Sequence, residues 1–127
     1  MNEILNRYSP LALAFIGDAH YNLVVKKAAI EKEAKVNGMQ NYAADYCSAR
    51  RQAQLARYLL EQGIYTEEEE LIYKKGRNVK SHQAPKNTDI LTYKASTGFE
   101  AVWGYWYLTD QQQRMEQIWN IIETIEE

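Results

Sequence analysis

The apolar residues of this chain recur at helical spacing along most of its length. Ser9 followed by Pro10 predicts an N-cap and the first position of a long helix, which runs to about Ala34. Near Phe15 the apolar residues surround most of the helix circumference, which predicts a central, buried element rather than a surface one. The Asn-Gly pair at residues 37–38 is expected to break this helix.

The next regions also carry helix signals. A second helical pattern covers about Asn41 to Glu61, in one or two pieces, and Gly63 is expected to terminate it. Thr66 and Glu69 have the spacing of a capping box, in which each side chain accepts a hydrogen bond from the other residue's backbone N–H. The helix that they open is predicted to be short, because two lysines suit its last turn and Gly76 suits its end.

Residues 77–87 are predicted to form a loop, marked by a serine, a proline and an asparagine. Thr88 or Asp89 is expected to cap a long helix that reaches about Leu108, and the Thr-Asp pair at 109–110 to cap the last helix. The apolar positions of that last helix, spaced i, i+3, i+4 and i+7, are Met115, Ile118, Trp119, Ile122 and Ile125. No stretch alternates like a strand, so the sequence predicts one all-α domain over residues 1–127.

Composition narrows the class of protein. A chain of 127 residues that is 46% hydrophobic suits one domain with one core. Its single cysteine, Cys47, excludes an intramolecular disulfide and suits a reducing compartment, where it is expected to be a small buried apolar residue. The N-terminus lacks the pattern of a signal peptide, and no apolar run approaches the length of a membrane span. We therefore expect a soluble, cytoplasmic protein without a membrane partner.

The distribution of charge is more informative than the net charge of −2. The segment from Tyr73 to Thr88 contains no acidic residue, and it carries five positive charges on Lys74, Lys75, Arg77, Lys80 and Lys86. Such a local excess in a weakly acidic protein indicates a contact with a polyanion. Charge alone leaves open the alternative that this is a solvated loop, whose lysines balance the glutamates of residues 67–70.

Two acids, Asp18 and Glu100, each lie within a strongly apolar stretch that is predicted to be buried helix. Buried carboxylates are usually paired, hydrogen-bonded or bound to a metal. The small residues Gly17 and Gly104 would allow the two helix backbones to approach closely, so that both acids hold one divalent cation, best Mg²⁺. The alternative is that each acid is satisfied locally, for instance Asp18 by Asn22 one turn further on.

A resemblance favours the paired arrangement. Residues 11–19, LALAFIGDA, resemble the signature of the ribonuclease III catalytic domain, and residues 96–108, STGFEAVWGYWYL, resemble its second acidic motif. Residues 75–80, KGRNVK, and 84–89, APKNTD, are similar to the Mini-III subfamily, which has the catalytic domain alone. The resemblance covers nearly the whole chain, with the motifs in matching order and separation.

Two departures from the wider family concern the metal. That family has four acids at the site, but Ala14 and Thr97 occupy two of the positions here, so only Asp18 and Glu100 carry over as catalytic and metal-linked carboxylates. The resemblance implies one Mg²⁺ with a mostly water-filled shell, for which Mn²⁺ is expected to substitute, and leaves open a second ion recruited by the substrate. Thr97 is a candidate to order a metal-bound water.

The resemblance also implies a function. We expect a homodimeric endoribonuclease that cleaves double-stranded RNA in the maturation of the large-subunit ribosomal RNA precursor, with possible assistance from a ribosomal protein. The expected RNA contacts lie in the basic loop and are Lys75, Arg77, Asn78, Lys80, Lys86 and Thr88. Two alternatives stay open: an inactive RNA-binding dimer, and a helical module for protein contacts.

The two histidines and the aromatic cluster of residues 103–107 are further candidates for a chemical role. His20 is two positions from Asp18 and therefore on another helix face, so packing or solvent contact is expected rather than metal binding. His82 in the basic loop is a candidate for a phosphate contact or a solvated histidine. The aromatic residues from Trp103 to Tyr107 are expected in the core or a dimer interface rather than as a base-stacking surface.

Overall fold

The structure, a computed structural model, describes residues 3–80 and 85–125, and every regular element in these ranges is an α-helix. The helices in chain order are α1 (Glu3–Arg7), α2 (Pro10–Lys32), α3 (Val36–Tyr46), α4 (Ala49–Glu61), α5 (Glu67–Arg77), α6 (Ile90–Leu108) and α7 (Gln112–Thr124). The all-α prediction is confirmed for these residues. Helix α1 is the one described element that the sequence pattern did not predict. No helix within them combines the length and apolar character needed to cross a membrane.

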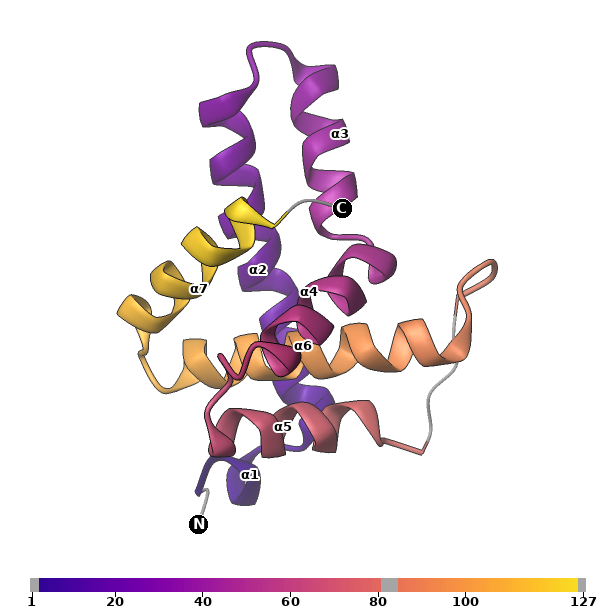
Figure 1. Cartoon of the computed structure of the whole chain (residues 1–127), viewed down its shortest axis with the longest axis vertical. Coiled ribbons are helices and arrows are strands. Elements are labelled where there is room, and N and C mark those ends of the chain that lie inside the picture. Colours follow the sequence, from indigo (N-terminus) through magenta and orange to yellow (C-terminus); the bar gives the residue numbers. More distant parts are fainter. Residues whose placement is uncertain (1–2, 81–84, 126–127) are drawn as a thin grey trace.

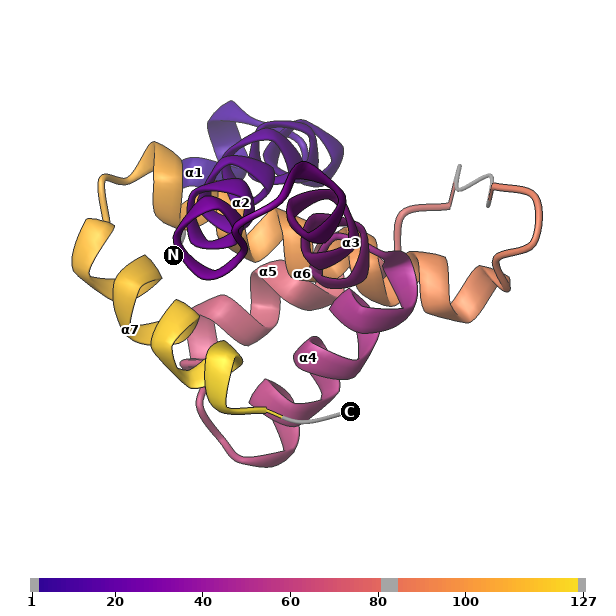
Figure 2. The ribbon, with the colours of Figure 1, turned by 90° about the horizontal axis from the view of Figure 1, so that it is seen from above.

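Helix α6 lies at the centre of the molecule, and α2, α4, α5 and α7 pack around it (Figure 1; Figure 2). Apart from Glu100, the residues from Ser96 to Trp106 are all buried. The largest of them, Trp103 and Trp106, are almost fully enclosed and stack edge to face with ring centroids 5.4 Å apart. The expectation that the aromatic residues from Trp103 to Tyr107 lie in the core or a dimer interface is confirmed for the core at Trp103, Tyr105 and Trp106, whereas Tyr107 is 42% exposed.

Helix α2 packs through one face only, so the prediction of a central rather than a surface helix is wrong. Its buried side includes Leu13, Gly17 and Tyr21, which face α6 and the core. Phe15 is 82% exposed, and other apolar side chains of α2 are exposed as well. The central position belongs to α6, and the apolar residues of α2 that face outward are available for another molecule.

Three of the predicted N-caps are confirmed. The Ser9 hydroxyl accepts a hydrogen bond from the backbone of Ala12, and the Thr66–Glu69 capping box is complete. Asp89, rather than Thr88, caps α6 by accepting from two backbone N–H groups. Each of these side chains satisfies a donor that a helix start leaves without an intrahelical partner.

Three predicted helix boundaries are wrong. The chain breaks at Glu33–Lys35, which is extended at both ends, and residues 37–38 form the first turn of α3. Gly76 lies inside α5, where a Cβ would come within 2.9 Å of the Ala101 Cβ, so it permits a close helix contact rather than ending the helix. Thr109 closes α6 by donating to the Tyr105 carbonyl, and α7 begins after Gln111 without a side-chain cap.

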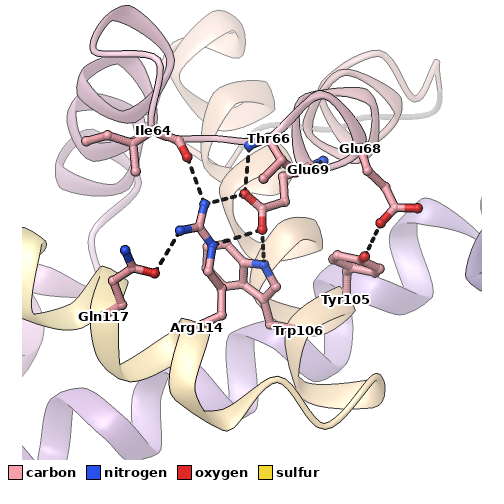
Figure 3. A network of polar contacts seen from close by, with 8 residues as sticks. All are labelled: Ile64, Thr66, Glu68, Glu69, Tyr105, Trp106, Arg114 and Gln117. Carbon is pink, nitrogen blue, oxygen red and sulfur yellow. Dashed lines mark hydrogen bonds and ion pairs between the residues drawn. The ribbon is translucent and has the colours of Figure 1, made fainter.

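A buried ion pair ties α5 and α7 to α6 (Figure 3). Arg114 of α7 donates two hydrogen bonds to the Glu69 carboxylate, at 2.7 and 3.0 Å, and a third to the Ile64 carbonyl. The Trp106 indole and the Thr66 backbone also donate to Glu69. Burial alone would raise the pKa of Glu69, but the bonds from Arg114, Thr66 and Trp106 outweigh it and lower the pKa. The carboxylate is therefore charged and fully partnered.

Candidate active site

The crossing of α2 and α6 brings the two acidic motifs together. A Cβ on Gly17 would overlap the carbonyl oxygen of Glu100 and lie 2.7 Å from the Gly104 nitrogen, and a Cβ on Gly104 would overlap the Leu13 carbonyl oxygen. The two backbones are therefore in direct contact, as the small residues predicted. Asp18 and Glu100, each next to this crossing point, project from it on neighbouring helices.

The Gly17→Ala variant should separate α2 from α6, because the obstacle is backbone that cannot rotate away. We expect a loss of about 1–3 kcal/mol of unfolding free energy, the usual cost of overpacking. Thermal unfolding of the native and variant proteins measures it. The matched control is Gly63→Ala at an open position, where the only cost is the positive φ of 66°. A Gly17→Ala protein as stable as the native one would contradict this close contact.

The carboxyl groups of Asp18 and Glu100 face each other within hydrogen-bonding reach. The pKa of Glu100 is raised to about 9, first by burial, then by a hydrogen bond with Asp18 and by the Asp18 charge. Asp18 itself is exposed, so the prediction that both acids are buried is wrong for this one. Asn22 also donates to its carboxylate at 3.0 Å, as the local alternative predicted. The Asn22–Asp18 hydrogen bond and the Asp18–Glu100 contact are therefore both present.

Two further residues at this site were not identified from the sequence. Cys47, at the end of α3, has its pKa raised to about 11 by burial and then by the Asp18 charge. Gln52, on α4, faces Glu100 and opposes the rise in its pKa. A signal for Gln52 was present, because it occupies a core position of the i, i+3, i+4, i+7 pattern completed by Leu55, Ala56 and Leu59. Its partner on another helix was not visible from that pattern.

Ala14 and Thr97, where the wider family has acids, are both buried at 5% exposure. The Thr97 hydroxyl donates to the Tyr93 carbonyl at 3.1 Å, so its proton is already used within α6. Only its oxygen lone pairs are left for a water, and that role stays a prediction. Residues 3–80 and 85–125 contain no group of three or more His, Cys, Asp or Glu side chains arranged to hold a metal. Any cation here would depend on the acid pair.

Lys75 and Arg77 lie in the last turn of α5, so their predicted place in a loop is wrong. The other described residues of the basic segment, 78–80 and 85–88, lie between α5 and α6 at the N-terminal end of α6 (Figure 1). Of the predicted contacts, those with exposed side chains are Lys75, Asn78, Lys80 and Lys86. Arg77 is half-buried, with its guanidinium 5.6 Å from the Tyr73 ring and its Nε donating to Asn78. Thr88 is half-buried in a turn closed by its N–H donating to Pro85. Glu100 is ten residues into α6, about 15 Å along its axis from the loop.

His20 has the structural role that was expected. Its Nδ1 accepts a hydrogen bond from the Trp103 indole at 3.0 Å, and its ring lies 4.6 Å from that of Tyr107. Burial lowers the pKa of His20, which favours the neutral ring that this hydrogen bond requires. Ser81 and His82 of the basic loop lie outside the described residues, so the role suggested for His82 stays a prediction.

Comparison with known proteins agrees with this geometry. Residues 11–111 match the family described as "Ribonuclease III domain". The chain is 44% identical to Mini-ribonuclease 3 of Streptococcus pneumoniae over 115 residues, 90% of each protein, and 43% identical to that of Staphylococcus aureus over 118 residues, 92% of this chain and 88% of the relative. It is also similar to the crystal structure of protein FN1578 from Fusobacterium nucleatum, with a TM-score of 0.80, 28% identity and 91% of each chain covered. The chain belongs to the ribonuclease III family, within the group of the Mini-ribonuclease 3 proteins.

Proposed function

We propose that this chain, an endoribonuclease of the ribonuclease III family, cleaves double-stranded RNA with one Mg²⁺ held between Asp18 and Glu100. The observation that carries the proposal is the close approach of these two carboxyl groups at the Gly17–Gly104 crossing. They come from the two segments that resemble the family's acidic motifs. The RNA substrate follows from the family, and the position of the cation from the acids.

The carboxylates of Asp18 and Glu100 are suited to bind a divalent cation, because a cation between them removes their mutual repulsion. Two neighbouring carboxylates repel unless one takes a proton or a cation lies between them. The pKa of Glu100 is raised first by burial, then by the hydrogen bond with Asp18 and by the Asp18 charge. Mg²⁺ prefers oxygen ligands and commonly keeps several waters beside one or two carboxylates. When bound, such an ion activates a water and stabilises the charge that develops on the scissile phosphate. Asn22 would hold the Asp18 carboxylate in place through its hydrogen bond.

The proposal is tested by the metal dependence of cleavage by the native protein. A labelled RNA duplex and its single strands are incubated with the protein in EDTA, Mg²⁺, Mn²⁺ or Ca²⁺. We expect cleavage of the duplex with Mg²⁺ or Mn²⁺ and none in EDTA. Duplex binding without cleavage under all these conditions would instead support an inactive RNA-binding protein. Absence of binding as well would support a module for protein contacts.

A second copy of the chain is the proposed partner for the exposed apolar face of α2. Leu11, Phe15 and Leu23 are 42%, 82% and 64% exposed and lie four or eight residues apart, on one side of the helix. Asp18 is exposed three residues after Phe15, so pairing along this stripe would place the active sites near the seam between the copies. A homodimer would also give one site for each RNA strand.

The Phe15→Glu variant should be monomeric at concentrations where the native protein is a dimer. Burying a glutamate at the centre of an apolar interface should cost about 2–4 kcal/mol of association free energy. Sedimentation equilibrium measures it, with Leu91→Glu as control because Leu91 is 75% exposed at the start of α6, outside the stripe. The interface is elsewhere if Phe15→Glu dimerises like the native chain.

Phosphate contacts by the basic loop are the proposed source of RNA affinity. The double variant Arg77→Ala, Lys80→Ala should bind a duplex more weakly, and the slope of log K against log salt should fall by about one for each phosphate that is no longer neutralised. Filter binding in Ca²⁺ across several salt concentrations measures both quantities. The control is Lys32→Ala, at the end of α2, where the lysine pairs with Glu123. An unchanged affinity and slope in the double variant would exclude this loop.

The proposed RNA substrate, cellular location and protein partner rest on the resemblance to the Mini-III subfamily. We propose the large-subunit ribosomal RNA precursor as the substrate, the cytoplasm as the location and a ribosomal protein as an assisting partner. Incubation of a precursor transcript with the native protein, followed by mapping of the ends, tests the substrate. Cleavage at the mature ends is the expected result, and cleavage of unrelated duplexes in preference to the precursor would contradict it.

A further inference from the structure

The junction between α3 and α4 lies beside the acid pair. Tyr21, one turn after Asp18 on α2, donates from its hydroxyl to the Tyr46 carbonyl at 3.1 Å and so holds the end of α3 against α2. The next residue, Cys47, is close enough to Asp18 to be affected by its charge. Helix α4 starts two residues later and packs its apolar face on α6. The first turn of α4 is therefore placed over Glu100.

Gln52 lies in that first turn, and its side chain is incompletely satisfied. It is 1% exposed, yet its Nε2 has no hydrogen-bond partner that meets normal geometry. The amide is nevertheless near enough to Glu100 to favour the charged form of that carboxyl group. A buried N–H group without a partner costs about 1–3 kcal/mol, so each such group calls for an explanation, of which a catalytic role or a nearby ion is one.

We propose that Gln52 is a positioning residue for the metal site, whose amide N–H donates to the Glu100 carboxylate when the cation is bound. The inference rests on the proposed function, because it requires a cation between Asp18 and Glu100. Among the described residues, Gln52 is the buried side-chain donor without a partner that faces the Glu100 carboxyl group. Its amide is therefore placed to orient that carboxylate toward a cation.

This arrangement is what metal-ligating carboxylates generally require. Hydrogen bonds from outside the ligand shell fix the orientation of the ligand, and their loss typically weakens metal affinity by about 10–100-fold. The Gln52 amide is fixed within the core by its neighbours on α4, so it can select one orientation of Glu100 without moving.

A direct titration with Mn²⁺, followed by electron paramagnetic resonance without RNA, tests the role of Gln52. The proteins are the native chain, Gln52→Met, Asp18→Asn and the control Gln54→Met. Methionine matches the shape of glutamine but cannot donate. Gln54 is on the same helix but lines a different cleft, with Arg57 and Thr124. We expect Gln52→Met to weaken Mn²⁺ binding about 10–100-fold, with Gln54→Met unchanged.

Thermal unfolding without metal separates positioning from a structural role. Because methionine removes an unsatisfied amide, Gln52→Met should be as stable as the native protein or more stable. A variant that loses both Mn²⁺ affinity and metal-free stability would overturn the proposal in favour of a structural role. If Gln52→Met binds Mn²⁺ like the native chain while Asp18→Asn does not, the inference about Gln52 is wrong and the metal site stands. If Asp18→Asn binds Mn²⁺ like the native chain, or if neither of these two proteins binds Mn²⁺, the proposed metal site itself is wrong.

Discussion

Asp18→Asn and Glu100→Gln are each expected to abolish cleavage of double-stranded RNA while the fold stays intact. Each substitution keeps the shape of the side chain and removes one of the two carboxylates of the proposed metal site. A catalytic metal supplies several kcal/mol of charge stabilisation in the transition state. Its loss therefore corresponds to a rate decrease of about a thousandfold or more.

Single-turnover cleavage of a labelled duplex in Mg²⁺ measures this effect. The control is Glu31→Gln, which neutralises another acid of α2 that is exposed and pairs with Lys27. Circular dichroism and duplex binding in Ca²⁺ verify that the variants are folded and still recognise RNA. Retention of near-native cleavage by either Asp18→Asn or Glu100→Gln would show that the reaction does not depend on this pair.

Arg114→Met should be the most destabilising single change among the ion pairs described above. It would leave Glu69, whose side chain is 4% exposed, buried without its cationic partner (Figure 3). Breaking a buried pair in this way costs about 3–5 kcal/mol of unfolding free energy. The surface pair Lys27–Glu31 is the comparison, because Lys27→Met should cost about 1 kcal/mol or less.

Urea unfolding of both variants gives the two values. Adding Glu69→Gln to Arg114→Met should recover part of the loss, because glutamine removes the buried charge and can still serve in the capping box. Equal stabilities of Arg114→Met and Lys27→Met would mean that the Glu69–Arg114 pair does not hold α7 to the rest of the molecule.

The sequence predicted those features that depend on short-range patterns. Ser9, Thr66 and Asp89 cap their helices because a side-chain oxygen can reach the backbone only within the next few residues. The close crossing of α2 and α6 was predictable for a related reason. Gly17 and Gly104 mark positions where a side chain would prevent contact, and each lies within about one turn of its acid. The motif resemblance then identified which two glycine-bearing helices meet.

The features that were missed depend on what lies opposite a residue in space. Gly76 has the appearance of a helix end, but it lies inside α5 because Gly98 and Ala101 of α6 occupy the space of a side chain. The exposure of Asp18 follows from the packing of α2 through a single face. Gln52 shows a core position in its own helix, and only the placement of α4 on α6 directs its amide to Glu100. No pattern within one helix contains this information.

The most direct test of the two-acid metal site is the position of a bound ion. Crystals of the native protein soaked with Mn²⁺ give an anomalous signal that locates the ion independently of catalysis. We expect one Mn²⁺ between Asp18 and Glu100, bound by an oxygen of each at about 2.0–2.3 Å, with the remaining positions filled mainly by water. An ion bound elsewhere, or by only one of these carboxylates, would contradict a site shared by the two acids.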